Sequence, residues 1–120
     1  DFMVYSGTET FLLETLLNGG AGCITATANL LSTECQQVFQ AWKNERLEEA
    51  QQKQKKLTSL RKAFESYPFV SGLKSIFADQ KDSNDWEHMM PPFDGLMKDQ
   101  LHELKEKIKD LGLDLSKRLS

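Results

Sequence analysis

The sequence predicts an α/β protein that opens with a parallel strand-helix-strand unit and continues as a series of helices. Residues 2–5 and 21–27 are short runs rich in strand-forming residues, and a leucine-rich helical stretch lies between them. From Ser32 onward, apolar residues recur at the spacing of amphipathic helices. A strand, a helix and a second strand within so short a span make a βαβ unit, whose strands pair in parallel through a right-handed crossover.

Composition and charge place the chain among soluble globular proteins. It has 120 residues, 39% of them hydrophobic, and a formal net charge of −3, which is enough for one domain with one core. No apolar run reaches the roughly 20 residues that a membrane span requires, and residues 1–20 lack the features of a secretory signal. We therefore expect a cytoplasmic protein without a membrane partner. The mild acidity argues against a nucleic-acid partner.

The first strand and the helix after it follow from local patterns. Residues 2–5 form a continuous apolar run, typical of a strand covered on both faces. Ser6 and Glu9 fit the S-x-x-E capping box, in which the serine hydroxyl accepts from the Glu9 amide and the carboxylate reaches back to the serine amide. Residues 18–20, Asn-Gly-Gly, end the helix because glycine adopts the left-handed conformation at low steric cost. The apolar face of this helix consists of Phe11, Leu12, Leu13, Leu16 and Leu17.

The second strand completes a unit that needs further neighbours. Residues 21–27, AGCITAT, carry several small side chains, which imply close approach by another element. Parallel sheets need strands on both edges and helices on both faces, and no third strand of comparable quality follows. We therefore expect the missing strands to lie in sequence before Asp1 or in another chain.

The remaining residues are predicted to form helices. Ser32 or Thr33 caps a helix that breaks at Asn44, and a second helix then runs to the Tyr67-Pro68 pair, because proline disfavours a continuing helix. The Gln-Lys run at residues 51–56 is expected to be its solvated face, since glutamates flank it. The apolar positions of the two helices are Val38, Phe39, Trp42, Leu47, Ala50, Leu57, Leu60 and Phe64.

The last part of the chain alternates helix and loop. A short helix is predicted within residues 69–77, followed by a polar loop at residues 79–85 and the stretch WEHMMPPF. A final amphipathic helix ends at Gly112. Its narrow apolar stripe, which suits a single packing seam, consists of Leu101, Leu104, Ile108 and Leu111.

Side chains with reactive chemistry are few. Cys23 and Cys35 have no CxxC spacing, and we interpret both as buried small apolar side chains. His88 and His102 have no Ser or Cys nucleophile beside them and are interpreted as surface or satisfied histidines. The lysines lie on solvated helical faces, whereas a lysine that forms a Schiff base must be desolvated. The sequence thus predicts no catalytic residue, metal site or cofactor within these residues.

Polar residues gather where the two strands end, and this is where we expect a ligand. The glycine cluster at residues 19–22 lies between a helix and a strand, so it is interpreted as a helix stop and not as a phosphate loop. In parallel α/β sheets, ligands bind at the carboxyl ends of the strands. The polar and glycine residues at these ends are Ser6, Gly7, Thr8, Glu9, Thr25, Thr27 and Asn29.

These same residues carry a resemblance. The stretch VYSGTETFLLETLLNGGAGCITATANL at residues 4–30, followed by a helix, a Pro-Pro pair and the terminal LKEKIKDLGL, resembles the C-terminal part of the dihydrodipicolinate synthase and N-acetylneuraminate lyase family. The resemblance implies a (β/α)8 TIM barrel with appended helices. Residues 2–6 and 21–27 would be strands seven and eight. Residues 1–43 would be the last two βα units, and residues 44–120 the remaining barrel helix and the C-terminal appendage.

The resemblance also implies a chemistry. Members are pyruvate-dependent class I aldolases and related lyases, commonly tetramers, that bind pyruvate or another 2-keto acid as a Schiff base on a lysine of strand six. That lysine would precede Asp1, so the resemblance implies that the chain alone is inactive and supplies substrate-binding residues only. These would be Gly7, Thr8 and the main-chain carbonyl of Ile24. Thr8 and Glu9 replace two aspartates usual in dihydrodipicolinate synthases, which favours relatives that cleave 2-keto-3-deoxy sugar acids or 4-hydroxy-2-oxoglutarate.

A second interpretation stays open from the sequence. The chain could be a non-enzymatic helical interaction module whose two strands complete the sheet of a partner. Either way its expected partners are the rest of a barrel or sister subunits, and the intact protein is expected to be a homo-oligomer.

Overall fold

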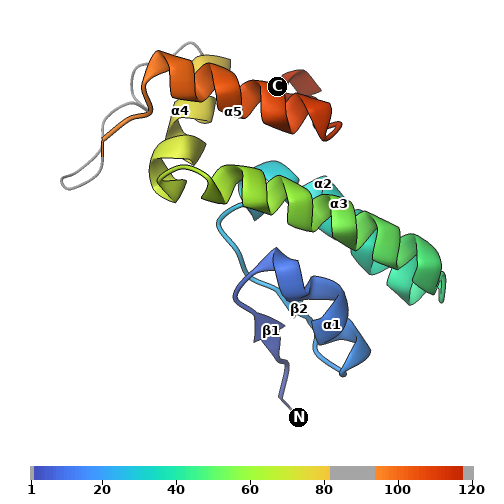
Figure 1. Ribbon diagram of the computed structural model, residues 1–120. Coiled ribbons are helices and arrows are strands. Elements are labelled where there is room, and N and C mark those ends of the chain that lie inside the picture. The colour runs from blue at the N-terminus through green and yellow to red at the C-terminus, as the bar shows by residue number, and fades with distance from the viewer. Residues whose placement is uncertain (1, 82–93, 118–120) are drawn as a thin grey trace. The chain divides into compact units, whose positions relative to one another are not determined.

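The computed structural model describes residues 2–81 and 94–117. The described elements divide between two compact units, Asp1–Arg61 and Lys62–Ser120, and the third helix runs through the boundary between them. In chain order (Figure 1), the elements are β1 (Tyr5–Ser6), the 3-10 helix η1 (Glu9–Phe11), α1 (Leu12–Leu17), β2 (Gly22–Cys23), α2 (Ala28–Lys43), α3 (Leu47–Glu65), α4 (Phe69–Lys81), α5 (Lys98–Asp110) and the 3-10 helix η3 (Leu115–Lys117).

The predicted parallel pairing of the two strands is confirmed. Tyr5 lies opposite Gly22, and Ser6 lies opposite Cys23. The pairing continues on both sides, because the Ala21 amide donates to the Val4 carbonyl at 2.7 Å and the Ile24 amide donates to the Ser6 carbonyl at 2.9 Å. Each strand has only two regular residues, fewer than the runs at 2–5 and 21–27, since no third strand among the described residues extends the ladder.

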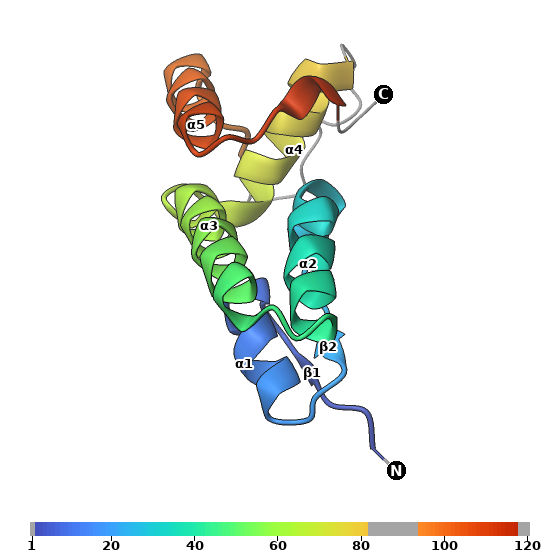
Figure 2. The same cartoon turned by 90° about the vertical axis from the view of Figure 1, so that its right-hand side faces the viewer.

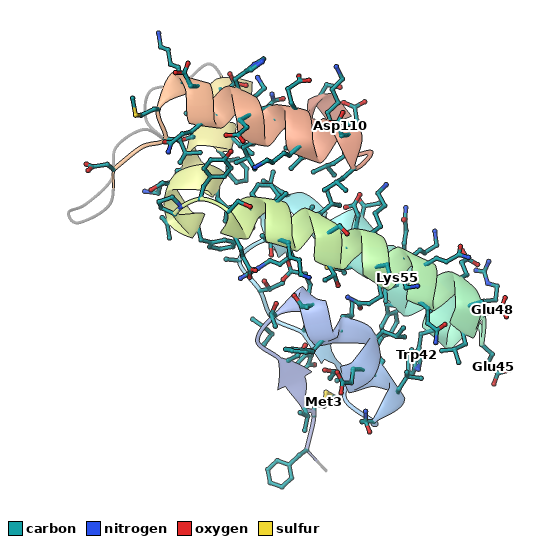
Figure 3. All side chains as sticks on the ribbon, in the orientation of Figure 1. Met3, Trp42, Glu45, Glu48, Lys55 and Asp110 are labelled. Carbon is teal, nitrogen blue, oxygen red and sulfur yellow. The ribbon has the colours of Figure 1, made fainter. Side chains whose placement is uncertain are left out.

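The predicted coverage of the first strand is not found within the described residues. The side chains of Phe2, Met3 and Val4 are 100%, 76% and 60% exposed. Figure 3 shows Met3 on the segment that leads into β1. A continuous apolar run is suited to burial on both faces, but burial requires neighbours that the described residues do not supply.

The capping box predicted for Ser6 and Glu9 is wrong. The Ser6 hydroxyl donates to the Thr8 carbonyl at 3.0 Å and does not accept from the Glu9 amide. Thr8 is instead the N-cap of η1, and its hydroxyl oxygen accepts from the Thr10 amide at 3.3 Å. The Glu9 carboxylate is occupied by distant side chains, so it cannot turn back to the Ser6 amide.

The end of the first helix and its buried face follow the sequence pattern. Helix α1 ends at Leu17 with Asn18 as its C-cap, and Gly19 takes a φ of +83°, which glycine adopts without steric cost. Three of the five apolar side chains predicted for this face are buried, whereas Phe11 and Leu17 are 54% and 55% exposed. The buried ones are Leu12, Leu13 and Leu16.

Helices α2 and α3 run antiparallel and are joined by residues 44–46 (Figures 1 and 2). Helix α2 begins at Ala28, before the predicted cap at Ser32 or Thr33, but its backbone kinks at Leu31. The break at Asn44 is confirmed, and Glu45 adopts a positive φ of 58° in the turn. Within the Gln-Lys run, Lys55 is exposed as predicted (Figure 3), whereas Gln54 is half-buried and bonds to the main chain after β1. The buried apolar side chains of this part are Leu30, Leu31, Val38, Ala41, Ala50, Leu57 and Leu60.

In the second unit, α4 and α5 pack against each other. The α3 stop before Pro68, the helix after it and the final helix ending near Gly112 are confirmed, and Gly112 has a φ of +79°. The Leu96 amide donates to the Ser75 hydroxyl oxygen at 3.1 Å, which ties the start of α5 to α4. Most of the predicted loop at 79–85 and the stretch WEHMMPPF lie outside the described residues. The unit's main buried side chains are Phe64, Leu73, Ile76, Leu104 and Ile108.

Two glycines make a matched test of the packing around β1. A Cβ at Gly20 would lie 2.3 Å from Thr15 Cγ2, 2.9 Å from the Thr15 carbonyl oxygen and 3.1 Å from the Val4 carbonyl oxygen. A Cβ at Gly7 would have no described atom within 4 Å. We expect Gly20→Ala to lower the free energy of unfolding by about 1–3 kcal/mol, because the backbone must shift. Gly7→Ala should leave it unchanged. Thermal unfolding by circular dichroism checks both, and equal midpoints would contradict the packing described.

Candidate functional site

The parallel pairing brings the predicted binding residues to one place. Gly7 and Thr8 directly follow β1, and Ile24 directly follows β2, which pairs with β1 up to the Ile24 amide. Ile24 has a side chain that is 71% exposed, and Gly7 borders open space. We call Gly7, Thr8 and Ile24 the wall residues. The carboxyl ends of both strands thus lie side by side, and these are the ends at which ligands bind in parallel α/β sheets.

A buried carboxylate lies directly beneath these residues. Glu9, the residue after Thr8, is 0% exposed. The Thr25 hydroxyl donates to Glu9 Oε2 at 2.6 Å, and the Thr27 hydroxyl donates to Glu9 Oε1. Thr27 is fully buried as well. Both carboxylate oxygens are therefore occupied, and this carboxylate has no exposed surface with which to act as an acid or base on a ligand.

An arginine of α3 completes the arrangement. Arg61 Nη1 lies 3.5 Å from Glu9 Oε2, and the Arg61 side chain is 17% exposed. The same nitrogen donates to Thr27 Oγ1 at 3.1 Å and to Thr25 Oγ1 at 3.3 Å. Each threonine hydroxyl gives its one hydrogen to the carboxylate and accepts from the guanidinium, so it links the two charges. We call Glu9, Thr25, Thr27 and Arg61 the Glu9 cluster.

A second residue of α3 holds the main chain after β1. Gln54 Nε2 donates to the carbonyl oxygens of Glu9 and Thr10 at 3.0 and 3.1 Å, and Gln54 Oε1 accepts from the Leu13 amide at 3.0 Å. Gln54 and Arg61 are about two turns apart and therefore lie on one face of α3. This face fixes both the side chain of Glu9 and the backbone around it.

The sequence placed Glu9, Thr25 and Thr27 near the strand ends but did not connect them to Arg61. The capping-box pattern predicts a local partner for Glu9, and the Gln-Lys run that contains Gln54 predicts a solvated face. The signal that could have revealed the cluster is a polar pair, Gln54 and Arg61, in register with the buried leucines of the same helix. Asn29, also predicted at the strand exits, is exposed and donates to the Ala26 carbonyl.

The interpretation of the two cysteines as buried apolar side chains is wrong. Both thiols are only half-buried, and both line one small cavity between β2, α1 and α2. The Cys35 thiol donates a hydrogen bond that lowers the pKa of Cys23, although burial and the Glu9 charge oppose the shift. The pKa of Cys35 is raised by its hydrogen bond to Cys23 and by burial. Cys23 lies in β2 and Cys35 in α2, so their contact depends on how α2 packs beside β2.

The remaining candidates from the sequence are the two histidines and the glycine cluster. His102 is exposed on α5, as expected of a surface histidine, and His88 lies outside the described residues. The glycine cluster ends a helix, as predicted. Across residues 2–81 and 94–117, no group of three or more His, Cys, Asp or Glu side chains could hold a metal ion. Within the same ranges, no helix is both long enough and apolar enough to cross a bilayer.

The βαβ start, the parallel strand pair and the helical continuation define a chain of the α/β class. The dihydrodipicolinate synthetase family matches residues 1–111. The chain therefore belongs to this family.

Individual relatives agree with this assignment. A probable mitochondrial 4-hydroxy-2-oxoglutarate aldolase from Emericella nidulans is 40% identical over 53 residues, which cover 44% of this chain and 17% of that protein. The chain thus spans about one-sixth of this curated relative.

Solved structures show the same likeness in fold. A prophage protein of the dihydrodipicolinic acid synthase family from Escherichia coli K12, in complex with pyruvate, is 26% identical with a TM-score of 0.80, over 94% of this chain and 38% of that one. N-acetylneuraminate lyase from Fusobacterium nucleatum is 23% identical with a TM-score of 0.80, over 92% of this chain and 38% of that one. The chain therefore spans less than two-fifths of either structure. These neighbours are TIM-barrel proteins, which accords with the α/β class predicted.

The thiol pair gives a prediction about reactivity. Because its pKa is lowered, the Cys23 thiol ionises at a lower pH than an ordinary cysteine, whereas Cys35 stays protonated. With limiting iodoacetamide near neutral pH, we expect alkylation of Cys23 before Cys35. Cleavage after Glu34 separates the two residues for mass spectrometry.

A matched variant checks the cause of this selectivity. Cys35→Ala removes the donor, so the pH at which alkylation of Cys23 is half-maximal should rise. Faster labelling of Cys35, or no change in the variant, would contradict the hydrogen bond described.

Proposed function

We propose that these residues are strands seven and eight of a (β/α)8 barrel, with appended helices, in a pyruvate-dependent class I aldolase or lyase. The observation that carries the proposal is the parallel pairing of β1 and β2, which places the wall residues side by side at the strand ends in a chain of this family. Residues 1–43 would then hold the last two βα units. Residues 44–120 would hold the remaining barrel helix and the appendage.

In this proposal the chain lines the substrate pocket and does not carry the reactive amine. A lysine elsewhere in the barrel forms an iminium with pyruvate or another 2-keto acid, and the iminium accepts electrons while a carbon–carbon or carbon–oxygen bond forms or breaks. Gly7 lets the substrate lie against the backbone, because no described atom occupies the position of its missing Cβ. The Thr8 hydroxyl and the Ile24 carbonyl would face the substrate from the two strand ends. On this basis the 120 residues alone have no turnover.

The exposed apolar segment before β1 supports the same arrangement. Phe2, Met3 and Val4 directly precede β1, and their apolar side chains are exposed. Such a run is suited to burial by further strands and helices. In the proposal the rest of the barrel covers them. The other interpretation, a non-enzymatic module that completes the sheet of a partner, uses the same exposed run, and the adduct experiment below separates the two.

The proposal also covers the substrate class, the assembly and the location of the intact protein. The curated relative is named for 4-hydroxy-2-oxoglutarate, a 2-keto acid, and Thr8 and Glu9 differ from the paired aspartates usual in dihydrodipicolinate synthases. We therefore favour a 2-keto acid whose cleavage releases pyruvate. The intact protein would be a homotetramer with sister subunits as partners, and without a nucleic-acid or membrane partner. The relative is described as mitochondrial, so a cytoplasmic location stays a prediction.

Trapping with borohydride tests the chemistry. The full-length protein that contains these residues should gain one covalent pyruvate adduct when sodium borohydride reduces the iminium. Peptide mapping should place the adduct on a lysine outside residues 1–120. Borohydride without pyruvate is the control. An active protein without an adduct, or an adduct on a lysine of this chain, would reject the proposal.

The role of Gly7 has a separate test. Gly7→Ala should leave the thermal midpoint unchanged but raise the half-saturating pyruvate concentration for adduct formation about tenfold, since a methyl group would enter the substrate's space. The control is Gly95→Ala, an exposed glycine in the second unit that follows neither strand. Unchanged pyruvate saturation in the Gly7 variant would remove this residue from the pocket wall.

A further inference from the structure

The wall residues have few contacts of their own. Gly7 borders open space and Ile24 is 71% exposed. The Thr8 hydroxyl bonds locally, to the Thr10 amide and hydroxyl. The strand ladder ends at the hydrogen bond from the Ile24 amide to the Ser6 carbonyl. Backbone pairing therefore stops just where the proposed pocket begins.

Beyond the last backbone hydrogen bond of the ladder, the Glu9 cluster joins the two strand ends through side chains. Glu9 is the residue after Thr8, and Thr25 is the residue after Ile24. Their side chains meet at 2.6 Å, and Thr27 adds a second bond to the same carboxylate. Gly7 and Thr8 are thus within two residues of Glu9, and Ile24 is next to Thr25, which binds the Glu9 carboxylate.

The carboxylate in turn depends on α3. A fully buried charge is stable only if it is paired and hydrogen-bonded, and Arg61 supplies the opposite charge. If Arg61 loses its charge, the carboxylate is favoured to move toward water, and it would carry the segment after β1 with it. Gln54 still holds the carbonyl oxygens of Glu9 and Thr10, so we expect the movement to stay local to residues 7–9.

We propose that Arg61 and Glu9 are positioning residues, through which α3 sets the spacing of the two strand ends that bind the substrate. This inference rests on the proposed function. It goes further by giving α3, an element outside the two βα units, a role in substrate affinity. The alternative role for the cluster is general stabilisation of the core, which would not alter the affinity of molecules that remain folded.

The experiment measures pyruvate saturation in the full-length protein. Arg61→Met and Glu9→Gln should each raise the half-saturating pyruvate concentration for borohydride trapping about tenfold or more, because displacement of a binding group by about 1 Å is enough for such an effect. The maximal trapping rate per folded molecule should stay within about twofold, since the lysine lies elsewhere. Arg61→Lys, which keeps the charge, should recover part of the affinity.

Two controls make the result specific. Arg46→Met removes an arginine that pairs with Glu49 at 2.7 Å but is 56% exposed, and it should change neither quantity. The double variant Glu9→Gln/Arg61→Met removes both charges, so its effect should be smaller than the product of the single effects. This double variant also keeps the test informative if Arg61→Met folds poorly, because it leaves no unpaired buried charge.

The outcomes separate the inference from the proposed function. If the wild-type protein traps pyruvate but the Glu9 and Arg61 variants keep its half-saturation, or lose only maximal rate and thermal midpoint, the positioning role is rejected. If the wild-type protein traps no pyruvate, the proposed function is rejected. In that case amide hydrogen exchange decides the positioning role. Faster exchange confined to residues 7–9 and 24–27 in Arg61→Met supports it, and uniform or unchanged exchange overturns it.

Discussion

The structure around the two strands depends on how one buried carboxylate is satisfied. Glu9 is fully buried, and removing the partner of such a charge costs about 3–5 kcal/mol in proteins. Thr25, Thr27 and Arg61 supply the hydrogen bonds and the opposite charge. Glu9 follows β1, and its partners come from the end of β2 and from α3, so satisfying one side chain fixes three segments that are distant in sequence.

This constraint matters because the sheet is small. Two residues in each strand make a regular ladder, and an isolated two-stranded sheet is marginally stable in water. The buried face of α1 and the main-chain contacts of Gln54 add to the pairing. The first unit therefore combines weak backbone pairing with strong side-chain anchoring at the strand ends, where geometry would matter most for a bound substrate.

Predictions from local patterns succeeded where the physical cause was local. Glycine at Gly19 ended α1, and Pro68 marked the end of α3, because each residue restricts or permits backbone angles whatever its neighbours are. The parallel pairing was also predicted, since a short strand-helix-strand connection leaves little choice. The predicted capping box is absent because the Glu9 carboxylate instead binds Thr25, Thr27 and Arg61, which come from other parts of the chain. The burial predicted for the cysteines is wrong because the exposure of Cys35 depends on how α2 packs beside β2.

By itself, the sequence determined the order of strands and helices, the parallel unit and the strand ends as the place for a ligand, because periodicity and turn residues act through neighbouring backbone. Only the tertiary structure decided that Glu9 pairs with Arg61 through Thr25 and Thr27, and that the two thiols are neighbours. A polar side chain can be satisfied by many partners that are equally compatible with its local sequence. Which partner it meets is set by the packing of helices that the chain brings together later.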